Sequence, residues 1–405
     1  MRHKQLCGWK LDEVTAQMNS SRIDSNRASS ALACDWKRRE ELLLAPYAMF
    51  SKDSAGRRYD EPFHAYRSPF QRDRDRILHS AAFRRLSGKM QVFTGDMGDY
   101  HRTRLTHTHE VATVARTIGR VLRLNEDLIE ALALLHDIGH PPFGHSGEDA
   151  LNACFAAQGG FSHNRFALTL AEELETRYTT YAGLNLSAEV LGGQDFRITH
   201  AGEVPLLEVQ VVDLADSLAY NAHDLDDALA LGLIKMQQLE SLDLVRRANE
   251  WGSAKSQSPT ERAQRQSLVH SLIDVQVADV LESAMEKMAD VKQLDSLSVR
   301  QLGIELTLSP IIASEREQLA QFLFDNVYRH KDLVAVRERA AKRVSRLVNL
   351  LIESPQYLPN RFLDRAQKVG IELAVRDYIA GMTDRFCDAQ YRGLIELGET
   401  KAQDW

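Results

Sequence analysis

The chain has 405 residues, 44% of them apolar and 26% charged, and its formal net charge is −7. This composition is ordinary for a globular enzyme and gives no general attraction for polyanions, so an anionic substrate would need locally clustered arginine and lysine. The apolar runs are too short for a membrane span, the first residues lack the apolar stretch of a signal peptide, and the four cysteines are too scattered for a disulfide framework or a thiolate zinc site. We therefore expect a cytoplasmic protein with no membrane partner.

Residues 1–60 mix serine, arginine, aspartate and alanine with little hydrophobic periodicity. We expect a loosely held or partner-contacting lead segment here. Basic residues then crowd the stretch from Arg57 to Arg104, and for most of them a solvated basic face is the simplest interpretation. Arg104 differs, because it precedes the candidate metal ligand His107 by about one helical turn.

From about residue 72 onward the pattern is helical almost throughout. Apolar residues recur at helical spacing after Thr106, and Asn125 caps a second apolar run that Pro141 and Pro142 must end. Strand patterns are scarce, so we predict an all-α fold. Further helices are expected at 163–178, 206–230, 258–290, 309–327, 331–354 and 371–396, with a short strand or an irregular loop at 183–204.

A polar stretch at 250–258 divides the helical part of the chain. We expect a lead segment at 1–60, a catalytic core at 61–250 and a C-terminal helical region at 251–405. Long amphipathic helices in the last region, such as 331–354, favour assembly into a homo-oligomer.

Residues 136–148, HDIGHPPFGHSGE, gather three imidazoles, two carboxylates, three glycines and two prolines. No ordinary core or surface segment needs this set, which predicts a metal-centred hydrolytic site. Because the prolines end the preceding helix, we expect His136 and Asp137 in its last turn, from which both can reach one ion. The mixed nitrogen and oxygen donors suit divalent ions such as Mn²⁺, Fe²⁺, Ni²⁺ or Mg²⁺.

Two further ligands must come from other helices. Upstream, His107 and His109 point about 200° apart on a helix, so only one of them can face the ion. Downstream, Asp213 and Asp216 lie in an otherwise apolar helix, where an unpaired carboxylate would be costly. The apolar neighbours of Asp216 favour it as the inward carboxylate, but spacing alone leaves both choices open.

The order His107, His136-Asp137, Asp216 resembles that of the HD-domain phosphohydrolases. Five sequence motifs within residues 83–229 resemble those of the deoxynucleoside triphosphate (dNTP) triphosphohydrolases of the dGTPase-like branch. They are FRRLSGKMQVF, RTRLTH, HDIGHPPFGHSGE, FSHN and VVDLADSLAYNAHDLDDAL. The resemblance implies an HD-domain helical fold with additional C-terminal helices. It also implies a divalent metal ion (Mn, Mg, Co, Ni or Fe) held by His107, His136, Asp137 and Asp216.

The activity that the resemblance implies is hydrolysis of a dNTP at the α-phosphorus, which releases deoxynucleoside and tripolyphosphate. Such a reaction needs an activated water, neutralised phosphate charge and a proton for the departing sugar oxygen. In the family pattern His145 and Glu148 are catalytic. We expect His145 to donate a proton or activate water, with Glu148 raising its pKa and fixing its orientation, and His163 to be a second active-site histidine.

Substrate contacts are also implied by the resemblance. Arg104 matches an arginine on phosphate, Tyr220 would pack on the sugar and exclude a 2′-hydroxyl, and Asp224 and Gln91 would reach the 3′-hydroxyl. The second HD dipeptide, His223-Asp224, then lies outside the metal site.

The remaining basic and imidazole side chains near these words have no assigned role. For Arg85 and Lys89, contact with phosphate and a place on the surface are both open. The isolated histidines are expected to be structural or solvent-exposed, and they are His140, His101, His79 and His64.

Two other functions compete with dNTP hydrolysis. An HD-family phosphohydrolase could act on nucleoside monophosphates or cyclic nucleotides, but Tyr220 and Asp224 weigh against this substrate class. A nucleotide-sensing regulator could have a metal site with only a structural role. The complete set of ligand and catalytic residues, however, gives no indication of an inactive enzyme. Further expected partners are a dNTP activator and, as a side hypothesis, single-stranded nucleic acid.

Overall fold

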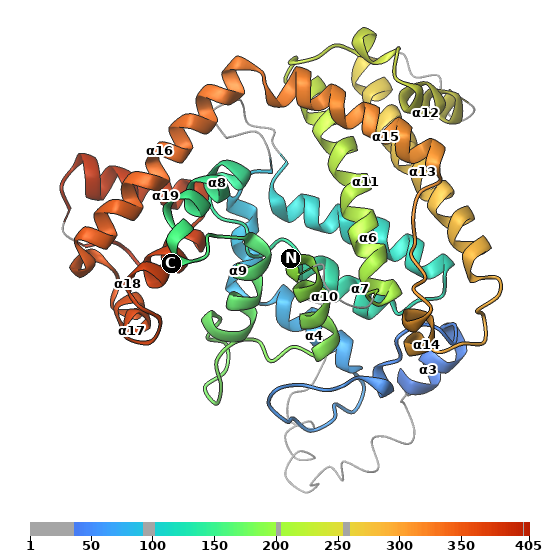
Figure 1. The fold of residues 1–405 in the computed structure, drawn as a ribbon, viewed down its shortest axis with the longest axis horizontal. Coiled ribbons are helices and arrows are strands. Elements are labelled where there is room, and N and C mark those ends of the chain that lie inside the picture. The colour runs from blue at the N-terminus through green and yellow to red at the C-terminus, as the bar shows by residue number, and fades with distance from the viewer. Residues whose placement is uncertain (1–35, 92–101, 200–203, 254–259, 400) are drawn as a thin grey trace, which may run out of the picture.

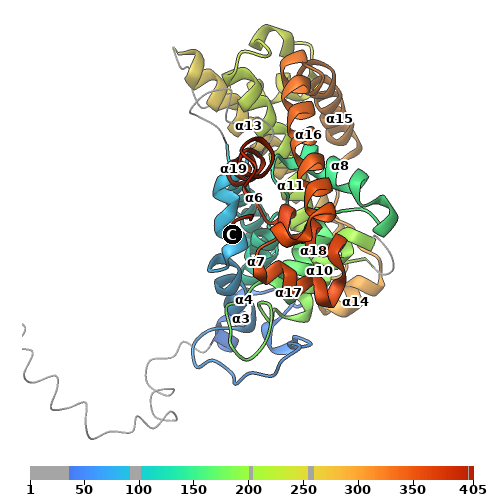
Figure 2. The same cartoon turned by 90° about the vertical axis from the view of Figure 1, so that its left-hand side faces the viewer.

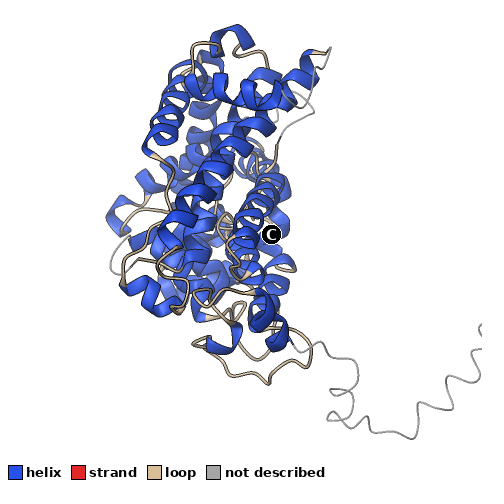
Figure 3. Cartoon of the chain, turned by 90° about the vertical axis from the view of Figure 1, so that its right-hand side faces the viewer, coloured by secondary structure: helices blue, strands red, loops and turns tan. Residues whose placement is uncertain are grey.

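The structure is a computed structural model that describes residues 36–91, 102–199, 204–253, 260–399 and 401–405. Helices dominate this part of the chain (Figure 3). Extended pairing within it is limited to two isolated β-bridges, Arg57 with Ser187 and Met90 with Thr103. The predicted all-α fold with additional C-terminal helices is therefore confirmed.

The first half of the molecule surrounds one apolar helix, α7 (Figure 1). The helices of this half are α3 (Trp36–Leu43), α4 (Pro69–Leu78), α5 (Ala81–Arg85), α6 (Arg104–Val121), α7 (Glu126–Leu135), α8 (Gly144–Cys154), α9 (His163–Thr169), α10 (Ala188–Thr199) and α11 (Leu207–Ala230). Asn125 caps α7 as predicted, with its side chain accepting from the amide of Leu128 at 3.3 Å. Because α7 packs against α4, α6, α10 and α11, its C-terminal end lies inside the molecule.

The C-terminal helices wrap around this core (Figures 1 and 2). They are α12 (Asp243–Ser253), α13 (Glu261–Met288), α14 (Ser296–Gln301), α15 (Pro310–Leu323), α16 (Lys331–Glu353), α17 (Asn360–Val369), α18 (Ile371–Ala380) and α19 (Asp384–Tyr391). Helix α16 packs against α8 of the core and against α18 and α19. None of the described helices combines the length and the apolar character that crossing a bilayer requires.

The stretch at 183–204, predicted to be a strand or loop, contains the helix α10, so that prediction is wrong. The glycine pair Gly192-Gly193 lies inside this helix. A Cβ on Gly193 would lie 2.5 Å from Leu132 of α7 and 2.9 Å from Val209 of α11. Gly193 therefore allows α10 to pack closely against α7 and α11, and it does not mark a turn.

A second difference concerns residues 371–396, which were predicted as one helix. The chain ends α18 at Ala380 and starts α19 at Asp384. Thr383 caps the new helix by accepting from the amide of Phe386 at 3.3 Å. The indole of Trp405 fills the space beside Gly381, where a Cβ would lie 2.1 Å from it. Tertiary packing thus breaks a segment whose periodicity is continuous.

The described part of the lead segment, residues 36–60, is hydrogen-bonded to the core. The expectation that it is loosely held is therefore wrong for these residues. The buried carboxylate of Glu208 accepts from the amides of Met49 at 2.8 Å and Asn125 at 3.2 Å. Glu40 accepts from the amide of Ser51 at 2.9 Å. These partners lie far apart in sequence, which is why local periodicity did not reveal them. Residues 1–35 of the segment, and residues 254–259 of the expected domain boundary, lie outside the described residues.

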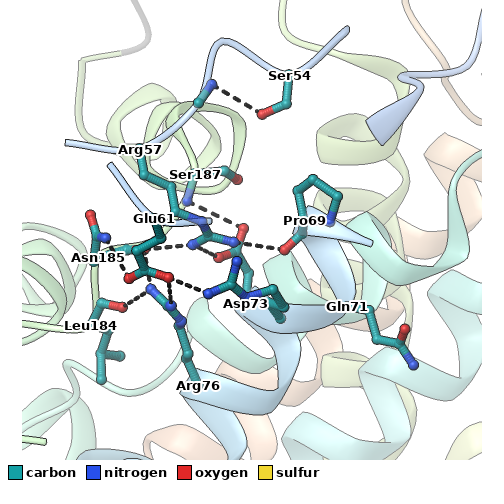
Figure 4. A network of polar contacts seen from close by, with 12 residues as sticks. Ser54, Arg57, Glu61, Pro69, Gln71, Asp73, Arg76, Leu184, Asn185 and Ser187 are labelled. Atoms are coloured by element: carbon teal, nitrogen blue, oxygen red, sulfur yellow. Dashed lines mark hydrogen bonds and ion pairs between the residues drawn. The ribbon is translucent and has the colours of Figure 1, made fainter. Parts of the chain in front are cut away.

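Most arginines of the basic stretch also differ from their prediction as a solvated face, because they form ion pairs, and those of Arg57 and Arg76 are largely shielded from solvent (Figure 4). Arg57 pairs with the fully buried Asp73 and donates to the carbonyl of Asn185 at 2.5 Å. Arg76 donates to the same carbonyl at 2.7 Å and pairs with Glu61. Burial opposes the charge of Glu61, but these hydrogen bonds lower its pKa to about 2. The network joins α4 to residues 57–61, which precede it, and to residues 184–187, which lie between α9 and α10.

Candidate metal and catalytic site

The helix that carries the HD dipeptide ends before the prolines. Helix α7 stops at Leu135, His136 is its C-cap, and Asp137 follows in a tighter turn. In that turn the amide of Ile138 bonds to Leu135 at 3.3 Å and the amide of His140 to Asp137 at 3.2 Å. The prediction that both ligands occupy the last helical turn is therefore wrong by about one residue, because the end of the helix tightens.

Three of the predicted ligands meet at the centre of the molecule. His107 of α6, His136 and Asp216 of α11 each offer a donor atom, and all these atoms lie within 4.8 Å of one another. Oδ1 of Asp216 lies 3.0 Å from Nε2 of His107 and 3.7 Å from Nε2 of His136. Burial opposes ionisation, but the two imidazoles hold the pKa of Asp216 below its usual range. This carboxylate is thus available as an anionic donor.

The orientation of His136 fits a metal ligand. Its Nδ1 lies 2.5 Å from the carbonyl of Ala133, to which it can donate, and this bond turns Nε2 toward Asp216. Nε2 itself is buried and has no hydrogen-bond partner. A buried nitrogen without a partner is costly, and a divalent cation among these nitrogen and oxygen donors would satisfy it.

Asp137 completes the donor set and is itself held by other side chains. Nη1 of Arg104 lies 3.0 and 3.1 Å from its two carboxylate oxygens, and Nδ1 of His140 lies 2.9 Å from Oδ1. Burial would raise the pKa of Asp137, but Arg104 and His140 hold it well below its usual range. Its Oδ1 lies 3.9 Å from Nε2 of His136, close enough to share an ion.

The two ligand choices that spacing left open are separated by geometry. His109 is exposed and its ring meets Phe83 edge-on, away from the donor atoms. Asp213 forms an ion pair with Arg197. The structure thus brings His107 and Asp216 into the cluster and leaves the other two outside it.

The start of α8 places the predicted catalytic residues beside this cluster. Phe143 and Gly144 both have left-handed backbones, with φ of 63° and 58°, and the helix begins immediately after this reversal. A Cβ on Gly147 would lie 1.9 Å from the carbonyl of Pro142, so any residue with a side chain at position 147 would clash with the loop. The glycines of the thirteen-residue run therefore build the loop, and His145 and Glu148 project from its first helical turns.

Glu148 supports a different imidazole from the one expected. Its carboxylate oxygens both lie 2.9 Å from Nδ1 of His163, and it also accepts from the amide of that residue at 2.9 Å. Burial and the charge of Arg104 lower the pKa of His145, and Glu148 only partly offsets them. Glu148 thus acts on the pKa of His145 in the expected direction, but burial and Arg104 outweigh it. His145 remains accessible to solvent, with its ring 6.5 Å from that of Tyr220.

His140 belongs to the site although the sequence gave no reason to single it out. Its ring lies 3.8 Å from that of His163, while its Nδ1 contacts Asp137. Burial and the charge of Arg104 hold the pKa of His140 well below its usual range. Together with His163 and Glu148 it forms a second group of clustered donor atoms. The one available signal was its position four residues after His136.

The predicted sugar contacts lie farther along α11. Asp224 is fully buried and accepts from the hydroxyl of Tyr328, a residue that sequence reasoning missed. Burial raises the pKa of Asp224 to about 6, although Tyr328 and Tyr220 work against this. A cleft of about 750 Å³ lies beside these groups, between α11 and α15. Its lining includes Asp216, Tyr220 and Arg316.

Arg104 and Gln91 lie on the other side of the cluster. Arg104 is buried, and its Nε has no partner. Its Nη2 donates to the backbone carbonyl of Gln91 at 3.4 Å, and the side-chain oxygen of Gln91 is buried without a partner. Two polar groups thus remain free to bind a ligand.

Arg85 and Lys89 do not lie on the surface. Arg85 stacks on Trp405, with 4.0 Å between its guanidinium carbon and the ring centre. Lys89 is buried, and its Nζ donates to the carbonyls of His140 and Ala380. His79 is exposed and His64 half-buried, as expected for isolated histidines. His101 lies outside the described residues.

Comparisons with known families agree with this geometry. The family model of the HD domain matches residues 104–221, and that of the phosphohydrolase-associated domain matches residues 306–393. An all-helical core with a buried His and Asp cluster thus defines an HD-domain phosphohydrolase. Deoxyguanosinetriphosphate triphosphohydrolase-like proteins are similar over almost their whole length, and the chain belongs to their family.

Three of these relatives are each 40% identical to the chain. The protein from Geobacter metallireducens matches over 370 residues, which are 87% of this chain and 95% of that protein. The protein from Nitrosomonas europaea covers 88% of this chain and 99% of its own length. For the protein from Bordetella pertussis these shares are 88% and 97%.

Proposed function

We propose that the protein hydrolyses dNTPs to deoxynucleoside and tripolyphosphate, with a divalent metal ion. One observation carries the proposal. Asp216, Tyr220 and Asp224 follow one another at four-residue steps on α11, so they face the same side and span about 12 Å. A metal ligand, an aromatic ring and a buried carboxylate in this order suit a nucleotide whose phosphates lie at the cluster and whose sugar lies farther along the helix.

His107, His136, Asp137 and Asp216 would hold the ion. When bound, it supplies Lewis-acid polarisation of the phosphate and lowers the pKa of a coordinated water. His136 and Asp137 are oriented for this task by the Ala133 carbonyl and by Arg104. We propose a manganese, magnesium, cobalt, nickel or iron ion, because imidazole and carboxylate donors suit all of these.

His145 would exchange protons with the reacting groups. Its lowered pKa keeps it neutral near pH 7, which suits acceptance of a proton from the attacking water. His163, fixed by Glu148 through Nδ1, presents Nε2 as a second proton-handling atom. The unpaired Nε of Arg104 would donate a hydrogen bond to a phosphate oxygen, and the free side-chain oxygen of Gln91 would accept one from the sugar.

The sugar would pack on Tyr220, with its 3′-hydroxyl donating to Asp224. Burial raises the pKa of Tyr220, so its ring stays neutral and apolar toward the sugar. A ring packed at the 2′ carbon leaves no room for a 2′-hydroxyl. The site would therefore select deoxynucleotides over ribonucleotides by exclusion.

The test is a turnover panel. Each of the four dNTPs, singly and mixed, is incubated with Mn²⁺, Mg²⁺ or Co²⁺, and the products are separated by anion-exchange chromatography. Deoxynucleoside and tripolyphosphate in equal amounts support the proposal. Orthophosphate from a nucleoside monophosphate, or opening of a cyclic nucleotide, would instead support the alternative HD-family reaction. Nucleotide binding without any product would support the regulator.

The mixed incubations also test activation by a second dNTP. Assembly into a homo-oligomer and binding of single-stranded nucleic acid stay predictions, to be checked by light scattering and by a gel-shift titration.

A further inference from the structure

The connection between α18 and α19 reaches the catalytic loop from the far end of the chain. Asp384, the first residue of α19, accepts with Oδ1 from the amide of Phe143 at 2.8 Å and with Oδ2 from the amide of Met90 at 3.0 Å. A Cβ on Gly88 would lie 2.9 Å from the side chain of Thr383, so the two segments are in close contact. One carboxylate thus joins two segments of the site, at Met90 and at Phe143, that lie far apart in the chain.

The amide of Phe143 belongs to the most constrained point of the loop. Phe143 has a left-handed backbone with φ of 63°, which a residue with a side chain adopts only when its surroundings hold it there. The next residues are Gly144, with φ of 58°, and His145, on the first turn of α8. The hydrogen bond from the Phe143 amide to Asp384 therefore fixes Phe143, and the backbone at Phe143 sets the direction in which α8 starts.

Lys89 makes a second connection next to the first. Its buried Nζ donates to the carbonyl of His140, in the same loop, and to that of Ala380 at the end of α18, at 3.2 Å for the latter. Arg104 lies on the other side of the loop, where its Nη2 would be 3.0 Å from a Cβ on Gly144. The loop is thus held between the core and the C-terminal helices at both of its ends.

We propose that Asp384 is a positioning residue for catalysis: it holds the backbone of Phe143, and through it places His145 against the metal cluster, while the same carboxylate holds Met90 and so Gln91. This inference rests on the proposed function for its kinetic part. It assigns to the C-terminal helices a task in the reaction itself, because the loop of the HD run depends on a residue 241 positions away.

The variant Asp384→Asn tests this. Asparagine has the same shape but only one acceptor oxygen, and its amide group would face one of the two N–H donors. We expect kcat to fall about tenfold to hundredfold, the effect of a misplacement near 1 Å. KM should change several-fold less than kcat, because most of the phosphate and sugar contacts stay in place.

Asp377→Asn is the matched control. Asp377 is a fully buried carboxylate of α18 that accepts from Arg365 at 2.6 Å and from Arg376 at 2.9 and 3.1 Å. The loss of this charge should lower stability at least as much as the loss of the Asp384 charge, because Arg376 and Arg365 both lose a buried anion and Arg365 keeps only its pair with Glu173. At equal folded fraction we expect its kcat to stay within about twofold of the wild-type value.

Hydrogen exchange supplies a readout that needs no activity. In Asp384→Asn the peptides covering residues 86–91 and 141–148 should exchange faster than in Asp377→Asn, whereas those of α7 should be unchanged. Equal exchange in both variants, or an equal loss of kcat, would overturn the positioning role. A wild-type protein without dNTP turnover would contradict the proposed function alone, because the exchange comparison would still decide the role of Asp384.

Discussion

The two ring nitrogens of His136 have different surroundings, and this difference is what a metal site requires. Nδ1 bonds to the carbonyl of Ala133, and Nε2 is buried without a partner. The carboxylates of Asp137 and Asp216 both keep a lowered pKa although burial opposes their charge. Two anions and an unsatisfied nitrogen within a few ångströms favour occupation by a cation.

Metal binding should therefore stabilise the folded protein. We expect the melting temperature to fall when EDTA strips the wild-type protein and to recover with Mn²⁺, because an ion at 100 times its Kd adds about 2.7 kcal/mol. Asp216→Asn removes one donor at constant shape and should weaken ion binding by about 10²-fold or more. Differential scanning fluorimetry with and without Mn²⁺ checks both.

An equal Mn²⁺-induced shift in Asp216→Asn would show that Asp216 does not bind the ion. Asp213→Asn is the control on the same helix, because Asp213 pairs with Arg197 outside the cluster. It should keep the full shift.

Asp224, the carboxylate proposed to bind the sugar, is expected to lower the stability of the folded protein. Burial raises its pKa from the ordinary range of an aspartate to about 6, so above pH 6 the folded protein bears a buried carboxylate that the unfolded chain solvates freely. Asp224→Asn should then be more stable than the wild type at pH 8, by about 1–3 kcal/mol. The advantage should shrink as the pH falls from 6 toward 4, because the wild-type carboxyl takes up a proton in the folded state.

Urea unfolding of both proteins at pH 8, 6 and 4 measures this difference. The same substitution should raise KM for dNTPs at pH 8, since a neutral amide accepts the 3′-hydroxyl less strongly than a carboxylate. A variant that is less stable than the wild type at every pH would show that the carboxylate is stabilised by its tyrosine partners rather than strained by burial.

At the scale of elements, the end of α7 and the start of α8 decide where the chemistry happens. Helix α7 brings His136 to the centre because its apolar residues are buried and it packs against four neighbours. The reversal at Phe143 and Gly144 then turns the chain back, so that α8 faces the same cluster. A Cβ on Gly139 would lie 2.0 Å from the carbonyl of His163, so α9 can approach the turn only over a glycine.

Helix α10 offers a test of close packing with an internal control. Gly192 has nothing within 4 Å of an added Cβ, whereas a Cβ on Gly193 would meet Leu132 at 2.5 Å and Val209 at 2.9 Å. Gly192→Ala should stabilise the protein by about 0.5–1 kcal/mol through helix propensity. Gly193→Ala should destabilise it by about 1–3 kcal/mol through overpacking.

Chemical denaturation of the two variants measures both effects on one helix. If Gly193→Ala were as stable as Gly192→Ala, α10 would not be packed as closely on α7 and α11 as the structure has it.

Local patterns in the sequence predicted most helices and much of the cluster. The apolar period and the Asn125 cap predicted α7. Spacing left His107 or His109 and Asp213 or Asp216 open, and the resemblance to the HD-domain phosphohydrolases chose the pair that meets His136. Helix ends were predicted less well. The Gly-containing, polar stretch 183–204 was predicted as a strand or loop but contains α10, and the separation of α18 from α19 depends on the packing of Trp405 against Gly381.

The partners that hold the site in place could not be predicted, because they are distant in the chain. Tyr328 lies 104 residues from Asp224, and Asp384 lies 241 residues from Phe143. The pairing of Glu148 with His163 instead of His145 depends on how α9 crosses α8. Such contacts depend on the tertiary arrangement of helices, which single-sequence periodicity does not encode.

At the scale of the whole molecule, the C-terminal helices contact the residues of the proposed site. The α18–α19 connection contacts the HD loop through Lys89 and Asp384, and α16 packs along α8 (Figure 2). Tyr328, which follows α15, contacts the predicted sugar-binding carboxylate. A variant lacking residues 306–405 should therefore lose dNTP turnover even if the core folds, because three of its supports are removed.

Isotope transfer from solvent tests the proposed reaction most directly. A single dNTP is hydrolysed with Mn²⁺ in water labelled with oxygen-18, and the masses of the products are measured by mass spectrometry. Attack of water at the α-phosphorus predicts one heavy oxygen in tripolyphosphate and none in the deoxynucleoside. Label in the deoxynucleoside, or pyrophosphate or orthophosphate in place of tripolyphosphate, would contradict the account.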